Sequence, residues 1–175
     1  MRHRHLFLTG YRGCGKSTIG RCVADLLDCP FLDTDVEIEA KASRTIAEIF
    51  ADLGEAGFRD LESNQIDELD LLREASVISL GGGSIVRVEN RITIRELGRV
   101  VWLQATPEIL CERIANDASS QLRRPKLSKL GDLEEIRHVL SQRRHWYEEV
   151  SDMAISTDDQ SMESIATQIA DWYRE

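Results

Sequence analysis

Short apolar runs alternate along this chain with longer segments whose apolar residues recur at helical spacing. Five runs predict short strands, at residues 5–9, 31–33, 76–80, 99–103 and 153–155. Between the first two runs, Ile19, Val23, Leu26 and Leu27 share one face of a predicted helix over 17–27. Strands that alternate with helices predict an α/β fold, with a parallel sheet covered by helices on both faces.

The other helices are predicted from their ends and their spacing. Thr45 and Glu48 have the spacing of a capping box, which predicts a short helix after Thr45. Pro107 is typical of a first helical turn. Further helices are predicted over residues 57–74, 132–150 and 162–173, and the polar, basic stretch 118–130 predicts a loop.

Composition and charge narrow the range of partners. The chain has 175 residues and a formal net charge of −9, which disfavours nucleic acid as the main partner because such proteins carry a basic face. No apolar run has the length of a membrane span or a signal peptide, so we expect no membrane partner and a cytoplasmic location. The four cysteines lack C-x-x-C and zinc spacing, which predicts buried, reduced thiols.

The most specific motif is Gly-Tyr-Arg-Gly-Cys-Gly-Lys-Ser at residues 10–17, which matches the P-loop pattern between a predicted strand and a predicted helix. Its glycines let backbone N–H groups surround phosphate oxygens, and the helix N-terminus favours an anion. We expect Lys16 to reach the β- and γ-phosphates and Ser17 to ligate Mg²⁺. An ordinary glycine-rich turn is the alternative. The predicted nucleotide-binding residues are Gly13, Cys14, Gly15, Lys16, Ser17 and Thr18.

Two carboxylates, Asp33 and Asp35, follow the second predicted strand. In an extended segment alternate residues face the same side, so we expect both at the phosphate end of the sheet. One would hold Mg²⁺ through water and the other would accept the proton of an attacking hydroxyl. The alternative is a pair of residues that cap a helix. The D-x-x-G and N-K-x-D motifs of signalling GTPases do not occur.

Together, these and later motifs resemble the shikimate kinase family, in the same order along essentially the whole chain. The matching residues after the P-loop are Asp33 and Asp35, the Phe-Arg-Asp-Leu-Glu segment at 58–62, Gly81–Gly83, Arg124 with Pro125, and Arg143 with Tyr147. The chain departs from the family pattern at Lys126, where the lid usually has Leu, and at His145, where Pro is usual.

The resemblance implies a three-layer α/β/α P-loop kinase fold with a five-stranded parallel sheet in one domain, residues 1–175. It implies a mobile lid at about 117–131 and a substrate-binding helical region at about 34–62 within that domain. The implied reaction moves the γ-phosphoryl group of ATP to the 3-hydroxyl of shikimate with Mg²⁺, a step of chorismate and aromatic amino-acid synthesis. By analogy we expect a monomer.

The resemblance also implies roles for individual residues. The implied catalytic residues are Lys16, Asp35 and Arg124. The implied substrate-binding residues are Asp35, Arg59, Gly81, Gly82, Gly83 and Arg143. The implied ligands of Mg²⁺ are Ser17 and Asp33. The implied nucleotide contacts beyond the P-loop are Arg113, which stacks on adenine, and Arg124, which closes over the phosphates.

Simpler interpretations stay open for several of these residues. Arg59 and Arg143 are either the arginines that bind the substrate carboxylate or solvated surface residues. Glu62 either holds Arg59 by an ion pair or forms an ordinary surface pair with it. Arg113 is either an adenine contact or a surface arginine of its helix, and Arg123 competes with Arg124 for the lid role.

Two other functions compete with the leading hypothesis. One is another small-molecule P-loop kinase, such as a gluconate kinase, and the other is a nucleotide-binding regulator without catalysis. The pair of Arg59 and Arg143 with Gly81–Gly83 favours shikimate over gluconate. The intact set of Lys16 and Asp35, among others, argues against a regulator that has lost catalysis.

Overall fold

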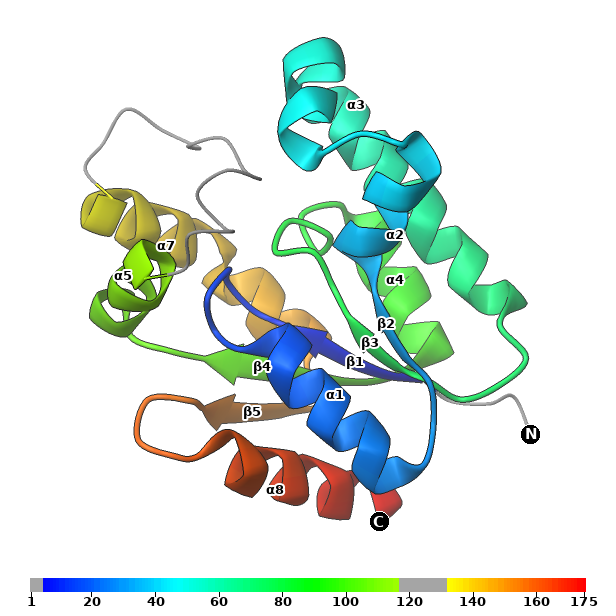
Figure 1. Cartoon of the computed structure of the whole chain (residues 1–175), viewed down its shortest axis with the longest axis vertical. Coiled ribbons are helices and arrows are strands. Elements are labelled where there is room, and N and C mark those ends of the chain that lie inside the picture. Colours follow the sequence, from blue (N-terminus) through cyan, green and yellow to red (C-terminus); the bar gives the residue numbers. More distant parts are fainter. Residues whose placement is uncertain (1–4, 117–131) are drawn as a thin grey trace.

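A five-stranded sheet organises the chain in the computed structural model, which describes residues 5–116 and 132–175 (Figure 1). The strands are β1 (His5–Thr9), β2 (Phe31–Asp33), β3 (Val77–Ser79), β4 (Gly98–Gln104) and β5 (Met153–Ser156). They lie in the order β2-β3-β1-β4-β5, and every pair is parallel. The carboxyl ends of all five strands therefore share one edge, where open α/β sheets bind ligands.

Helices cover both faces of this sheet (Figure 1). The helices are α1 (Lys16–Leu27), α2 (Thr34–Ala42), α3 (Ile46–Glu68), α4 (Val88–Leu97), α5 (Pro107–Asn116), α7 (Asp132–Val150) and α8 (Met162–Arg174). On one face α1 and α8 lie side by side, and α3, α4 and α7 contribute side chains to the core on the other face. No helix among the described residues is long and apolar enough to span a membrane.

The two faces hold separate cores because side chains alternate along each strand. Leu6 and Leu8 of β1 pack with residues of α1 and α8, whereas Phe7 between them packs with residues of α3, α4 and α7. All three side chains are at most 1% exposed. Burying a side chain of this size contributes about 1.5–3 kcal/mol, so β1 is firmly held beneath the loop that follows it.

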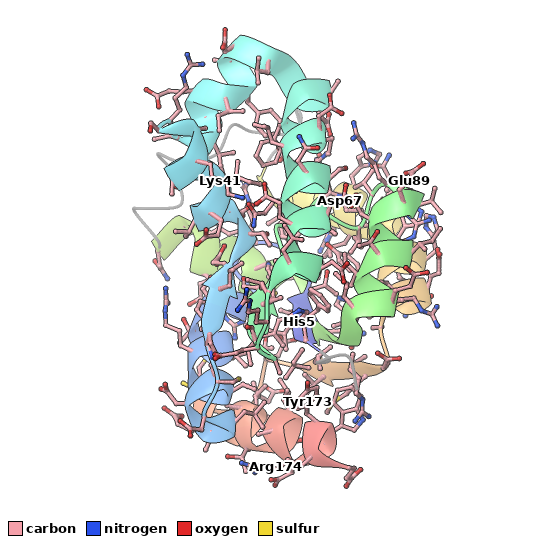
Figure 2. All side chains as sticks on the ribbon, turned by 90° about the vertical axis from the view of Figure 1, so that its right-hand side faces the viewer. His5, Lys41, Asp67, Glu89, Tyr173 and Arg174 are labelled. Atoms are coloured by element: carbon pink, nitrogen blue, oxygen red, sulfur yellow. The ribbon has the colours of Figure 1, made fainter. Side chains whose placement is uncertain are left out.

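The helices α2 and α3 form a separate unit above the sheet edge, with a small core of their own (Figure 2). Lys41 reaches from α2 to α3, where its ammonium donates to Gln65 Oε1 at 2.7 Å. The predicted capping box of Thr45 and Glu48 is confirmed at the start of α3. Gly54, with φ of 69°, is not helical and divides α3 into two helical segments, which correspond to the two helices predicted there.

The predicted fold class is confirmed: a five-stranded parallel sheet with helices on both faces. The helix predicted over 132–150 matches α7, whereas the one predicted over 57–74 is wrong at its end, since α3 stops at Glu68 and a 3₁₀ turn, η1 (Leu69–Leu71), follows. Sequence reasoning missed α4, which starts without a capping side chain. The predicted loop and lid, with Arg123, Arg124, Pro125 and Lys126, lie outside the described residues.

Candidate active site

The P-loop, residues 10–17, connects β1 to α1 at the ligand-binding edge of the sheet. Gly10, Gly13 and Gly15 have φ values of 141°, 82° and 96°, which side chains rarely tolerate. A Cβ on Gly10 would also lie 2.5 Å from the Leu103 carbonyl oxygen. Gly15 is the N-cap of α1 and offers no side-chain cap, which leaves the first N–H groups of α1 to bind an anion.

Lys16 is held over this loop by the loop's own carbonyls. Its Nζ donates to the carbonyl oxygens of Gly10 at 2.8 Å and Tyr11 at 3.1 Å, and the side chain is 9% exposed. The loop opens onto a cavity of about 570 Å³, the P-loop cavity, which Lys16 lines together with Asp33 and Asp35. A cation and a row of backbone donors at one cavity are suited to bind a polyphosphate.

Ser17 and Asp33 meet at this cavity. Ser17 Oγ donates to Asp33 Oδ2 at 2.7 Å, and Asp33 Oδ1 accepts from the backbone N–H of Asp35 at 3.1 Å. Asp33 is thus the N-cap of α2 and Asp35 lies in the first turn, so the expected extended segment is wrong and the capping alternative describes the backbone. Both carboxylates still reach the same cavity, because α2 begins directly at the end of β2.

These oxygens fit the requirements of Mg²⁺. Within residues 5–116 and 132–175, no three His, Cys, Asp or Glu side chains form a cluster that could hold a metal on their own. Mg²⁺ needs no such cluster, since it keeps several waters and uses one or two protein oxygens together with substrate phosphates. Ser17 and Asp33 provide such a pair beside the P-loop.

Thr34, between the two aspartates, fixes the strand ends that carry them. Its hydroxyl donates to the carbonyl oxygen of Ser79 at 3.3 Å and accepts from the N–H of Gly81 at 2.9 Å. The side chain is 2% exposed. Sequence reasoning gave Thr34 no role, because its partners on β3 and the following turn become neighbours only when the sheet forms.

A second, narrower cavity, the arginine cavity, opens beside the first between the P-loop, the α2–α3 unit, the 81–83 turn and α7. It brings together most of the predicted substrate residues, namely Asp35, Arg59, Gly82, Gly83 and Arg143, and the predicted positioning residue Glu62. Ile46, Phe50 and Phe58 add an apolar wall that sequence reasoning did not assign. The cavity thus combines cations, carboxylates and an apolar surface.

Arg59 is a buried cation, 7% exposed, which lies on α3 with two carboxylate partners. It forms an ion pair with Glu62 and a second one with Glu55, whose Oε1 lies 3.0 Å from Nη2. Burial lowers the pKa of Arg59, but the two carboxylates outweigh it and hold that pKa above its ordinary value. Burial raises the pKa of Glu62, although Arg59 and the hydroxyl of Ser84 counteract it.

The glycine turn leaves room for these side chains. A Cβ on Gly83 would lie 1.8 Å from Arg59 Nη1, and a Cβ on Gly81 would lie 2.5 Å from Asp35 Oδ1. A larger residue at either position would displace a charged side chain of the arginine cavity. These glycines are therefore required by close approach of side chains.

Arg143 and Tyr147 of α7 both donate to the carbonyl oxygen of Gly82, at 2.7 Å and 3.3 Å. Tyr147 is fully buried, and burial raises the pKa of its hydroxyl, which therefore stays protonated and remains a donor. Its ring stacks on Trp102, with centroids 5.2 Å apart. In the sequence Tyr147 only marked a motif, whereas in the fold it supports the turn on which Arg143 rests.

Comparison with known proteins shows the family of this chain. A family model described as shikimate kinase matches residues 12–174. A shikimate kinase of Rhodopirellula baltica is 43% identical over 169 residues, which are 97% of this chain and 90% of that protein. The chain belongs to the shikimate kinase family.

Solved structures agree with this assignment. A shikimate kinase from Acinetobacter baumannii, solved in complex with shikimate, has a TM-score of 0.89 and 35% identity, over 97% of this chain and 92% of the other. A gluconokinase from Sinorhizobium meliloti has a TM-score of 0.64 over 99% and 93% of the two chains, but at 17% identity it shares the fold alone. The family resemblance predicted from the sequence is therefore confirmed.

Arg113 is a further residue that the sequence predicted for the nucleotide site of this shikimate kinase family member. It lines the P-loop cavity, and its guanidinium donates to the hydroxyl of Thr157 at 2.9 Å and to the carbonyl oxygen of Thr157 at 2.6 Å. The bonds hold its plane beside the loop after β5. A contact with adenine stays a prediction. Cys14 is a fully buried residue of the P-loop, and its Sγ lies 3.9 Å from Lys16 Nζ.

Proposed function

We propose that this protein transfers the γ-phosphoryl group of ATP to the 3-hydroxyl of shikimate, in the synthesis of chorismate and the aromatic amino acids. Its family consists of shikimate kinases, which are ATP-dependent kinases. The observation that carries the choice of acceptor is the arginine cavity, where Arg59 and Arg143 lie beside Asp35 and next to the P-loop. An acid with ring hydroxyls needs cations for its carboxylate and acceptors for its hydroxyls.

Each group then has a defined task. Arg59 and Arg143 bind the carboxylate of the acceptor, and Glu62 positions Arg59. Asp35 accepts a hydrogen bond from the reacting hydroxyl and orients it towards the phosphate side. Lys16 offsets the charge of the β- and γ-phosphates. Phosphoryl transfer depends mostly on positioning and charge stabilisation, which is what these residues provide.

The proposal includes Mg²⁺, which Ser17 would hold directly and Asp33 through water. The ion supplies positive charge to the phosphates when it is bound. The nucleotide phosphates would bind the N–H groups of residues 13–18. We also keep as proposals the closing of Arg124 over the phosphates, the stacking of Arg113 on adenine, a cytoplasmic location and a monomeric state.

An assay of ADP release with MgATP tests this function, with shikimate, gluconate and no acceptor compared side by side. We expect release above background only with shikimate. Release with gluconate alone would make the protein a different small-molecule kinase. Folded, ATP-binding protein without acceptor-dependent release would be a non-catalytic regulator.

A further inference from the structure

The P-loop cavity and the arginine cavity meet at Arg12, Asp35 and Ile46, which line both of them. The glycine turn approaches the P-loop closely beside them. A Cβ placed on Gly82 would lie 3.6 Å from the carbonyl oxygen of Gly10 and 3.8 Å from the backbone nitrogen of Arg12. A phosphoryl group that moves from a nucleotide on the P-loop to an acceptor in the arginine cavity must cross this junction.

Arg12 is the cation at the junction, at a position that the P-loop motif leaves open. The other described arginines that line the two cavities each donate to a protein oxygen. They are Arg21, Arg59, Arg113 and Arg143. Among the described arginines, Arg12 alone lines both cavities. Like Arg59, it has a buried Nε without a hydrogen-bond partner in the described part of the chain. The guanidinium of Arg12 lies near the hydroxyl of Tyr11, and its place on both linings puts it where a ligand in either cavity would meet it.

We propose that Arg12 binds the phosphoryl group as it is transferred and holds it on the phosphorylated product. The inference rests on the proposed function, since it takes the acceptor to lie in the arginine cavity. Lys16 is tied to loop carbonyls on the nucleotide side, and Asp35 lies on both sides of the junction. Arg12 adds positive charge where the two cavities meet, and the charge of the phosphoryl oxygens shifts there during transfer.

The step conserves atoms and electrons. The bond between the γ-phosphorus and the bridging oxygen breaks, and its electron pair stays on ADP. A bond forms between the γ-phosphorus and the acceptor hydroxyl oxygen, whose proton passes to the carboxylate of Asp35 and then to solvent. Arg12 stays protonated throughout and acts by charge and by the donor fork of its guanidinium.

A group that binds the transferred phosphoryl stabilises the transition state and the bound product, but it does not stabilise the bound acceptor before transfer. Arg12→Gln is therefore expected to lower kcat by about 10–100-fold and to weaken binding of shikimate 3-phosphate by a similar factor. The Kd values of shikimate and ADP are expected to stay within about twofold, because neither carries the transferred group. Arg12→Lys keeps the charge but loses the fork, so its effect should be intermediate.

The experiment measures turnover with MgATP and shikimate, and calorimetric binding of shikimate, ADP and shikimate 3-phosphate. It compares the unchanged protein with Arg12→Gln, Arg12→Lys and a control, Arg44→Gln. Arg44 forms an exposed ion pair with Asp52 on the α2–α3 unit, and neither residue lines either cavity, so its substitution should leave every value in place. Thermal unfolding of each variant separates a loss of folding from a loss of binding.

Selective loss of kcat and of product binding supports the inference. Unchanged binding of shikimate 3-phosphate overturns the inference. An equal loss of affinity for shikimate and for shikimate 3-phosphate also overturns it, because Arg12 would then only shape the cavity wall. If the unchanged protein shows no shikimate-dependent turnover, the proposed function itself fails. That result is distinct from a fully active protein whose Arg12 variants behave like the control.

Discussion

The P-loop cavity and the arginine cavity are built in opposite ways. The centre of the P-loop cavity comes from eight consecutive residues, and it offers mainly backbone N–H groups and Lys16. The arginine cavity collects side chains from the P-loop, α2, α3, the glycine turn and α7. Its bond between Arg143 and Gly82 joins residues 61 positions apart. Phosphate binding is thus a local property of the sequence, whereas acceptor binding depends on the completed fold.

This difference predicts different kinetic consequences. Substitutions in the P-loop cavity remove charge from the reacting phosphates and should act on kcat. Substitutions in the arginine cavity remove contacts with the acceptor and should act mainly on its KM. Asp35 and Arg12 lie where the two cavities meet. Their substitutions should lower kcat, although both residues also border the acceptor.

Lys16→Ala should have the largest effect, a fall in kcat of about 1,000-fold or more, because a buried cation next to the phosphates is lost. Steady-state ADP release with saturating shikimate measures it. Lys41→Ala is the matched control, since Lys41 bonds only to α3 side chains in the described structure. A Lys16→Ala protein with more than a tenth of normal turnover would remove Lys16 from the chemistry.

Asp35→Asn should come next, with kcat lowered about 100-fold and ATP affinity nearly unchanged, because the amide cannot accept the hydroxyl proton. Asp60→Asn, on an exposed carboxylate paired with Arg87, serves as the control. The measurement is kcat together with the Kd of ATP. Full turnover in Asp35→Asn would exclude Asp35 from the reaction.

The same contrast explains how far the sequence alone could lead. The P-loop was predictable because its function follows from contiguous residues, and the strands were predictable because their apolar runs are short and separate. The conformation around Asp33 and Asp35 could not be predicted, because α2 starts immediately after β2 and no turn residues separate the two in the sequence. Roles of Thr34 and Tyr147 depend on partners 45 and 65 positions away.

Some site residues carried no usable signal in the sequence. Arg12 occupies an open position of its motif, and its importance follows only from the junction between the two cavities. Ile46, Phe50 and Phe58 form the apolar wall of the arginine cavity, and all three also pack in the small core of the α2–α3 unit. Such residues become interpretable only when the cavity that they line is known.

Arg143→Ala should raise the KM of shikimate by about 10–100-fold with a smaller change in kcat, because a charged contact with the acceptor is lost. The neighbouring substitution Arg144→Ala provides a sharp comparison. Arg144 donates to Glu148 on the exposed side of α7, whereas within the described residues it is Arg143 that bonds to Gly82. Equal KM values in the two variants would show that Arg143 does not bind the acceptor.

Glu62→Gln should have the smallest effect, about a 3–10-fold rise in the KM of shikimate. The variant also serves as the reference for the pH dependence of this KM. Burial raises the pKa of Glu62, so protonation begins above the ordinary range of a glutamate. As pH falls through this raised pKa, Glu62 loses its charge, Arg59 loses a partner and the KM of the unchanged protein should rise towards that of the variant. Glu62→Gln should lack this acidic rise.

The effect of Glu62 on folding should have the opposite sign. A carboxyl group whose pKa is raised in the folded state favours folding in its protonated form, so its contribution is complete below the ordinary pKa and declines as pH rises through the folded-state pKa. As pH rises through the folded-state pKa of Glu62, the KM of shikimate should therefore fall. Over the same pH range, the free energy of unfolding of the unchanged protein should fall relative to that of Glu62→Gln. Denaturant unfolding and KM, both measured from about pH 4 to 7, test this, with Glu55→Gln as the control for the exposed partner of Arg59. Parallel changes in KM and stability would show that Glu62 supports the fold alone and does not position Arg59 for the acceptor.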